Sequence, residues 1–393
     1  MISLLRNPRK PLLRITAILS AVWLAACEPV SGIGGNAGPS INTGAAVPVA
    51  LLVPAGSGNS GDEVLARSLR QAAELAISDL RGVKIDLRVY NTGGNPAQAA
   101  QTASQAVDEG AKIILGPVFA EAANAAGLAV ASRGVNVLSF SNNTDIAGGN
   151  VFVLGPSFPN TANRLVNYAA AKGKRRIMVV HEQTTAGDAG ARAIERAIAR
   201  SGASMVGKAS FPFSQQGVVN AIPAIAARAK GGDVDALFLT ADTAGALPLL
   251  AQMLPEQGVN PDTVKFLGLT RWDIPPATLS LPGVQGGWFA MPDPNLNKQF
   301  QSRYQAAFGE PPHPISGLAY DGIAAIGALV RAGKSDALTR GALTQGAGFV
   351  GVNGIFRLRA DGTNERGLAV AEIRNGQAVV IDAAPRNFGG AGF

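Results

Sequence analysis

Apolar runs and helical spacing alternate along most of the chain. Residues 47–53 (VPVALLV) form a continuous apolar run that ends at a proline and a glycine-rich loop, which is typical of a buried strand. Residues 63–80 then predict a helix, and residues 84–90 (KIDLRVY) alternate like a second strand. The residues that share one face of the predicted helix are Leu65, Leu69, Ala72, Ala76 and Leu80.

The same rhythm continues and restarts after a junction at 155–160. We expect strands at 47–53, 84–90, 112–115, 135–140, 176–181, 204–211, 236–239, 265–269, 286–291, 354–359, 368–374 and 377–381. We expect helices at 63–80, 96–109, 161–171, 189–201, 218–229, 244–257, 296–308 and 315–332, with one more ending near residue 132. The turn 360–363 is expected to join strands 354–359 and 368–374.

This pattern predicts an α/β fold of two lobes, each a parallel sheet flanked by helices, joined by a hinge with several crossings. We assign 47–157 and 289–333 to lobe 1, 158–288 and 334–384 to lobe 2, and 385–393 to a loose tail. More than 300 residues are too many for one ordinary core and suit two lobes. Ligands of such sheets bind beyond the carboxyl ends of the strands, so we expect a cleft there.

The N-terminus has the pattern of a secretory signal peptide. Four cations precede an apolar stretch that is too short for the ~20 residues of a membrane span. The stretch ends in Leu24-Ala25-Ala26-Cys27, which resembles the lipobox of bacterial lipoproteins. We therefore expect residues 1–26 to be removed, Cys27 to be lipidated, and residues 27–46, rich in Gly, Ser, Pro and Asn, to form a flexible tether.

Several functional classes become poor fits once Cys27 is the mature N-terminus. Cys27 is the only cysteine, so the mature chain has no disulfide, thiolate metal site or cysteine nucleophile. Loss of the four signal-peptide cations lowers the formal charge from +7 to +3. The net charge of the mature chain therefore gives no reason to expect nucleic-acid binding. Glu28 follows the cysteine, where an Asp usually retains lipoproteins in the inner membrane, so a periplasmic chain anchored in the outer membrane is slightly favoured.

Several runs resemble the type I periplasmic binding fold, especially its leucine/isoleucine/valine-binding branch. They are VALLVPAGSGNS, NTGGNPAQAAQTASQAVDEGAKIILGPVFAEAANA, GVNVLSFSNNTDI, HEQTTAGDAGARAIERA and ISGLAYDGIAAIGALVRAG. The resemblance covers roughly residues 47–381 and implies a non-enzymatic receptor with a ligand held between the lobes.

The ligand residues of that branch are only partly present. The family's hydroxyl after the Gly-Pro turn falls near Ala120, and its second polar loop falls near Ser141 and Asn143. The positions of its two tyrosines fall near Ala186 and near Ala241 or Asp242. The acidic partner of the α-ammonium falls near Arg271 and Trp272, so a simple branched-chain amino acid is a poor fit.

The loop 56–61 (GSGNSG) fits G-x-G-x-x-G, but the acidic residue of a dinucleotide site is missing from the end of the next strand. Two interpretations remain. The loop holds an anion at a helix N-terminus, with Ser57, Gly58 and Asn59 in contact, or it is a plain glycine turn.

The other candidate ligand-binding residues follow predicted strands. Arg271 offers a fork for a carboxylate or phosphate, and Trp272 offers a flat face, although Asp273 is also placed to pair with Arg271. Serine, threonine and asparagine are also common loop residues, so a purely structural role is an equal alternative for the rest. These residues are Ser139, Ser141, Asn143, Thr184, Thr185 and Asp242.

Nothing in the sequence predicts an enzyme, a cofactor or a metal site. The two histidines, His181 and His313, lack partner motifs, and no nucleophile elbow is present. Two hypotheses remain. The first is the solute-binding lipoprotein of an ABC-type uptake system, with a small polar, amino-acid-like ligand. The second is an outer-membrane lipoprotein that activates a penicillin-binding protein, which is a peptidoglycan synthase. It uses the same fold as a scaffold, and a peptidoglycan fragment is the alternative ligand.

Overall fold

The computed structural model describes residues 38–389, and its first sheet, sheet A, is parallel throughout with the order β2-β1-β3-β4-β5. Four of its strands were predicted, and the short strand β5 was not. The strands are β1 (Val47–Val53), β2 (Ile85–Asn91), β3 (Ile113–Leu115), β4 (Asn136–Ser139) and β5 (Val151–Val153).

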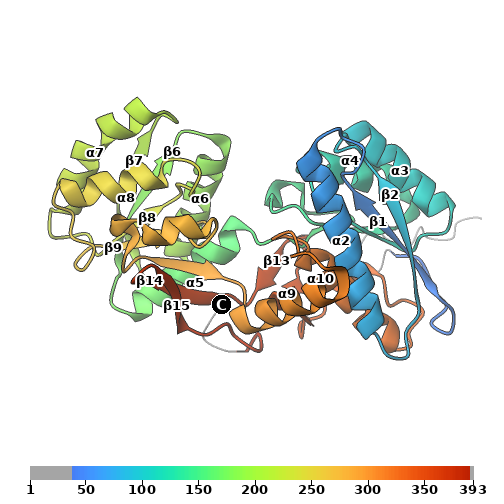
Figure 1. The fold of residues 1–393 in the computed structure, drawn as a ribbon. Coiled ribbons are helices and arrows are strands. Elements are labelled where there is room, and N and C mark those ends of the chain that lie inside the picture. Colours follow the sequence, from blue (N-terminus) through green and yellow to red (C-terminus); the bar gives the residue numbers. More distant parts are fainter. Residues whose placement is uncertain (1–37, 390–393) are drawn as a thin grey trace, which may run out of the picture. The chain divides into compact units, whose positions relative to one another are not determined.

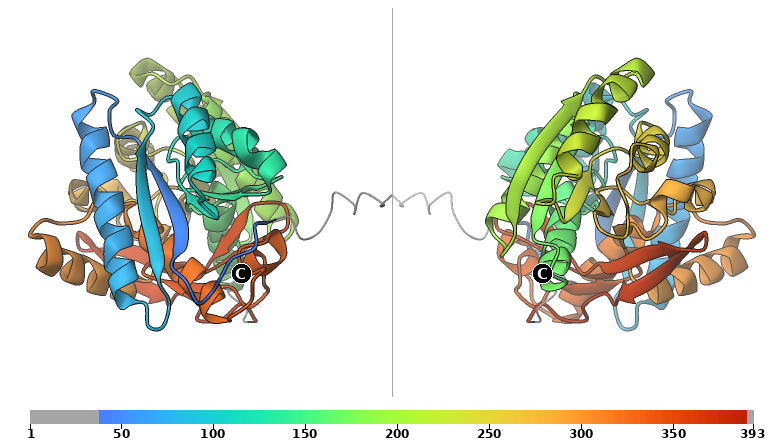
Figure 2. Two further views of the ribbon diagram at one scale, coloured as in Figure 1. Left: turned by 90° about the vertical axis from the view of Figure 1, so that its right-hand side faces the viewer. Right: turned by 90° about the vertical axis from the view of Figure 1, so that its left-hand side faces the viewer.

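Sheet A is covered on both faces because successive residues of its strands point in opposite directions. Val49 and Leu51 of β1 pack against α2 and α10, whereas Ala50 and Leu52 pack against α3 and α4. Figure 2 shows α2 on one side of these strands and the α3–α4 pair on the other. The helices of this lobe are α2 (Ser60–Asp79), α3 (Pro96–Asp108), α4 (Ala120–Val130), α9 (Pro294–Phe308), α10 (Gly317–Arg331) and the short α11 (Arg340–Leu343).

The second sheet, sheet B, has the order β15-β14-β10-β9-β8-β6-β7. It is parallel from β7 to β10, and β14 and β15 add an antiparallel edge. Helices α5 and α6 cover one face, and α7 and α8 cover the other (Figure 1). Its strands are β6 (Arg176–Glu182), β7 (Ser204–Phe211), β8 (Ala236–Leu239), β9 (Lys265–Gly268), β10 (Trp288–Met291), β14 (Ala369–Arg374) and β15 (Gln377–Asp382). Its helices are α5 (Phe158–Ala171), α6 (Thr185–Ala199), α7 (Gln215–Ala229) and α8 (Leu247–Glu256).

A third, antiparallel sheet, sheet C, corrects the expected hairpin. Strand β12 (Gly354–Leu358) pairs with β11 (Phe349–Gly351) and β13 (Asn364–Arg366), whereas β14 belongs to sheet B. The turn 360–363 therefore leads into the three-residue β13, and the chain then leaves for the other sheet. The four 3₁₀ helices span Ala131–Arg133, Thr144–Ile146, Pro276–Ser280 and Pro282–Val284.

The lobe boundaries differ from the expected ones in the C-terminal third. Phe349, Phe356 and Leu358 share a core with β1, α2 and α10, so residues 334–366 belong with sheet A, although we expected them in lobe 2. Strand β10 lies within sheet B, although we expected it in lobe 1. We therefore define lobe 1 as sheets A and C with their helices, and lobe 2 as sheet B with its helices. The chain passes between them after β5, after β10 and after β13.

Both expected loose ends are partly packed. Ile41, placed in the tether by sequence, is 6% exposed in the core of lobe 1, and its N–H donates to Ser335 O at 2.8 Å. At the other end, the Arg357 guanidinium lies 4.5 Å from the ring centre of Phe388. The signal peptide and Cys27 lie outside the described residues.

Candidate functional site

The strand order places a topological switch point in each sheet. Strand β1 lies between β2 and β3, and β6 lies between β7 and β8. Loops that leave the carboxyl ends of such strands diverge and leave room for a ligand. The loops after β4, β6, β8 and β9 carry most of the candidate residues predicted from sequence.

A cavity of about 240 Å³, here called the main cavity, lies at these loop ends. Residues of both lobes line it, including Asn142 after β4 and Thr270 and Arg271 after β9. Its apolar wall is formed by Phe158, Leu269, Ile274, Met291, Ile315 and Leu318. A mostly apolar wall with a few polar groups is the usual composition of a small-molecule site.

Arg271 is the main charged group of this cavity. Asp273 accepts hydrogen bonds from Nε of Arg271 at 2.8 Å and from Nη2, so the predicted pairing with Asp273 is present. Within residues 38–389, Nη1 of Arg271 has no protein acceptor, and 31% of the side chain remains exposed. The Asp273 carboxylate therefore orients a guanidinium that retains free N–H donors.

Two further polar residues line the main cavity, and they differ in whether their side chains have hydrogen-bond partners within the protein. Oγ1 of Thr270 is buried and has no hydrogen-bond partner in the described structure. Arg366 is committed to the protein, because it pairs with Asp321 at 3.0 Å and donates to Leu154 O. The Thr270 hydroxyl is thus buried beside the main cavity without a partner in the described structure, and Arg366 holds the cavity wall in place.

The glycine loop after β1 lies outside the main cavity. Ser57 Oγ donates to Asp62 at 2.8 Å, and Asn59 Oδ1 accepts from Gly61 N at 2.8 Å as the N-cap of α2. Gly58 has φ +79°, which a side chain would strain. The side chains of Ser57 and Asn59 therefore bond within the loop and the start of α2, and the anion-binding interpretation of the loop stays a prediction.

The serines after β4 form a chain of local hydrogen bonds. Ser139 Oγ donates to Pro117 O and accepts from Ser141 N, both at 3.1 Å. Ser141 Oγ accepts from Asn143 N at 3.1 Å, and Asn143 Oδ1 accepts from Asp145 N at 2.9 Å. Ser139 and Ser141 therefore shape the loop that presents Asn142 and Asn143.

Asn143 and Thr185 meet at a second cavity of about 350 Å³, which also contains Arg192 and Arg196 of α6. We call it the arginine pocket. It shares Asn142 and Phe158 with the main cavity, so the two cavities adjoin. Thr184 instead caps α6, where its Oγ1 accepts from Gly187 N at 3.0 Å.

The switch point of sheet B holds two carboxylates. A β-carbon at Gly245 would lie 2.8 Å from Asp242 Oδ1 and 3.3 Å from Glu182 Oε1, so both acids crowd this glycine. Burial, and secondly the negative charge of Asp242, raise the pKa of Glu182. Oε1 of Glu182 is also buried without a partner in the described structure. The local sequence does not reveal this burial of Glu182, because it is set by residues distant in sequence.

Trp272 lies elsewhere than the ligand-binding prediction placed it. The residue is fully buried, and its ring packs over Gly268 and Gly287, where a β-carbon would lie 2.3 and 2.4 Å from ring atoms. The ring also stacks on Phe289, with 6.5 Å between centres. Trp272 is thus part of the lobe 2 core and presents no face to a cavity.

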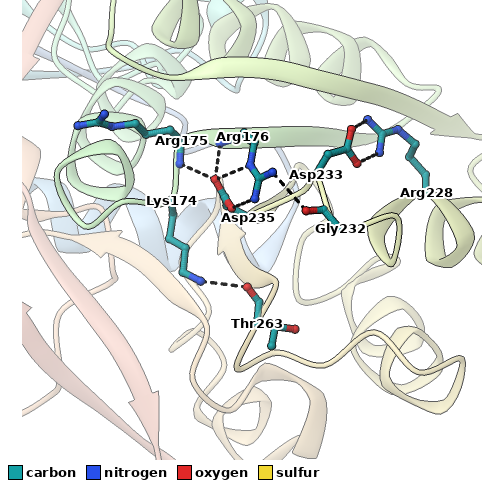
Figure 3. A network of polar contacts seen from close by, with 8 residues as sticks. All are labelled: Lys174, Arg175, Arg176, Arg228, Gly232, Asp233, Asp235 and Thr263. Atoms are coloured by element: carbon teal, nitrogen blue, oxygen red, sulfur yellow. Dashed lines mark hydrogen bonds and ion pairs between the residues drawn. The ribbon is translucent and has the colours of Figure 1, made fainter.

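The basic run at 172–176 lies at the amino end of β6, away from these cavities. Figure 3 shows Asp235 accepting from the backbone N of Arg175 and Arg176 and from the Arg176 side chain. Lys174 Nζ donates to Thr263 O at 3.0 Å. These bonds tie the starts of β6, β8 and β9 together, so this run has a structural role.

Across residues 38–389 no group of three or more metal-ligating side chains is present. In the same range no helix is long and apolar enough to cross a bilayer. Two other hollows border α9, of about 320 and 900 Å³, and contain none of the strand-end residues considered above.

Comparison with known proteins gives one family. Residues 46–378 match the periplasmic binding protein family. No curated protein matches the chain.

Several solved structures share the fold. A putative branched-chain amino acid ABC transporter protein from Rhodospirillum rubrum aligns with TM-score 0.73 and 21% identity, over 86% of this chain and all of that one. A Desulfitobacterium hafniense substrate-binding protein in complex with Leu gives 0.63 and 17%, over 86% and 100%. An R. palustris solute-binding protein in complex with benzoate gives 0.58 and 18%, over 89% and 99%. With the family match over most of its length, this chain belongs to the periplasmic binding proteins.

Proposed function

We propose that this chain is the solute-binding component of an ABC-type uptake system and that it binds a small organic carboxylate in the main cavity. The observation that carries the proposal is the position of Arg271, with Nη1 unpartnered in the described structure, against a largely apolar wall. A guanidinium binds a carboxylate through charge-assisted hydrogen bonds. No catalytic group is needed for this role.

The residues of the apolar wall indicate what the rest of the ligand, apart from its carboxylate, is like. Phe158, Ile274 and Met291 suit an aliphatic or aromatic body rather than a sugar. The ligands named for two structural neighbours, leucine and benzoate, are both carboxylates with such a body. An amino acid with an apolar side chain and an aromatic acid are therefore the first compounds to test.

The experiment is a thermal-shift screen of the mature chain carrying Cys27→Ser. A ligand at one hundred times its Kd adds about 2.7 kcal/mol to the free energy of unfolding. We expect hits among apolar carboxylates and loss of the shift in Arg271→Ala. Arg359→Ala, which removes an exposed cation at the turn after β12, is the matched control. A panel without hits, or a hit that survives Arg271→Ala unchanged, contradicts the proposal.

The lipid anchor at Cys27 belongs to the same proposal. Because Ile41 packs in lobe 1 and Gly38 contacts Thr339, residues 27–37 are the only ones left between lipid and domain. Eleven residues reach at most about 40 Å. Radiolabelled palmitate should enter the wild type and not Cys27→Ala, and membrane fractionation should show which membrane holds it. An inner-membrane position suits a permease partner.

The alternative is an activator of a penicillin-binding protein that is anchored in the outer membrane. This role requires a long tether between the lipid anchor and the domain that contacts the synthase. The short tether argues against it, and a hit in the ligand screen separates the two roles. A pull-down of a peptidoglycan synthase by the ligand-free chain would favour the alternative.

A further inference from the structure

Helix α6 carries Arg192 and Arg196, and Arg200 follows as its C-cap, so three arginines stand at four-residue intervals. This spacing places them along one exposed side, because residues four apart are neighbours on a helix surface. The opposite side, which includes Ala191, Ile194 and Ile198, is buried in lobe 2. Arg192 and Arg196 line the arginine pocket, whereas Arg200 does not.

The acids of α6 have partners other than these arginines. Glu195 pairs with Lys208 at 2.8 Å, and Asp188 lies 3.3 Å from Nδ1 of His181. Among residues 38–389, neither Arg192 nor Arg196 forms an ion pair. Two like charges one turn apart repel each other. The pocket therefore concentrates positive charge that the described part of the chain does not neutralise.

The loop after β4 supplies other polar groups of the pocket lining. Asn142 and Asn143 bring amide groups and Thr144 brings a hydroxyl, and Thr185 adds a second hydroxyl from the start of α6. Asp145 is the one acid of the lining, and its carboxylate lies more than 4 Å from either arginine, since no ion pair joins them. Two cations, one acid and several hydrogen-bond donors leave an excess of positive charge in a cavity of about 350 Å³.

We propose that the arginine pocket binds an oxyanion with two negative charges, a phosphate group or a dicarboxylate, through Arg192 and Arg196. Guanidinium forks match the geometry of carboxylate and phosphate oxygens, and two forks match two charges. The pocket is distinct from the main cavity, whose cation is Arg271. The inference goes beyond the proposed function and does not depend on it.

Isothermal titration calorimetry of the mature chain with inorganic phosphate and with glutarate, at low ionic strength, tests the pocket. We expect one of the two anions to bind, and Arg192→Gln/Arg196→Gln to weaken it at least about tenfold. Arg200→Gln is the matched control, because it removes the same charge from the same helix outside the pocket. Comparison of the two anions identifies phosphate or dicarboxylate as the source of the charge.

Other outcomes overturn the inference. Binding of neither anion at millimolar concentration excludes the pocket as such a site. An equal loss in Arg200→Gln would mean unspecific attraction to the helix. A loss in Arg271→Ala, with none in the double variant, would move the anion to the main cavity. The thermal-shift screen with carboxylates tests the proposed function independently, so a negative result there does not affect the arginine pocket. An unchanged melting temperature of each variant verifies that it folds.

Discussion

Arg366 and Asp321 form a buried ion pair between β13 and α10, with 3.0 Å between Nη1 and Oδ2 and side chains only 2% and 0% exposed. Asp321 also accepts from Val352 N at 2.8 Å, and Arg366 donates to Leu154 O. The pair thus joins sheet C, α10 and the end of β5. Arg366 also forms part of the main cavity wall, so this bond fixes the position of the site.

We expect Asp321→Ala to lower the free energy of unfolding by about 3–5 kcal/mol, because it leaves the Arg366 charge buried without a counter-ion. Urea unfolding measures the loss. Arg70→Ala is the control: Arg70 pairs with Glu74 at the surface, where such pairs contribute about 0–1 kcal/mol. Equal effects of the two variants would contradict a structural role for the buried pair.

Trp272→Ala should cost about 3–5 kcal/mol, because it opens a cavity against Gly268 and Gly287. Trp272→Phe should cost less, since Nε1 is buried without a partner in the described structure and its loss removes no hydrogen bond. Phe213 is 62% exposed, so Phe213→Ala should change the free energy of unfolding by less than about 0.5 kcal/mol. Thermal unfolding of the three variants checks this order. A Trp272→Ala variant as stable as the wild type would contradict the core role of Trp272, and a role in ligand binding would again be a candidate.

Most of the fold is predictable because its signals are local. The run VPVALLV and the spacing of Leu65 and Leu69 identify β1 and α2 without any knowledge of neighbours. Strands β5, β11 and β13 have three residues each, too few for a period to appear, whereas the equally short β3 is a wholly apolar run that ends at Gly116-Pro117. Assignment of 334–366 to lobe 1 depends on Phe349 and Phe356 meeting a core that includes β1 and α2, which end at Val53 and Asp79, and no local pattern encodes such a distant contact.

The candidate site was predictable in position and less so in role. Asn143, Thr185 and Arg271 lie at cavities because they follow parallel strands, and that follows from the strand order. Ser139 and Trp272 also follow strands, yet they face the protein, because the direction of a side chain after a strand depends on the loop. The sequence pattern does not predict Arg192 and Arg196 as pocket residues, because arginines on helices usually face only solvent.

Glu182→Gln should stabilise the protein at pH 7. Burial and Asp242 raise the pKa of Glu182, so the folded state holds the proton more tightly than the unfolded state. Below the ordinary value of 4.5 both states are protonated and no penalty exists; as pH rises through the folded pKa, ionisation destabilises the fold. The melting temperature of Glu182→Gln should thus exceed that of the wild type at pH 7, and the gap should close towards pH 4. Glu121→Gln, on the exposed side of α4, is measured at each pH as the control. A constant gap at every pH would rule out titration of Glu182 as its source.

Ile41 makes the segment before β1 part of the domain. Ile41→Ala should lower the free energy of unfolding by about 2–5 kcal/mol, because the side chain is 6% exposed in the core of lobe 1. Ser40→Ala, at an exposed neighbour, should change little. Denaturant unfolding of both variants measures the difference. If Ile41→Ala is neutral, residues 38–46 act as tether after all, the reach from the lipid grows to roughly 70 Å, and the argument against the activator role weakens.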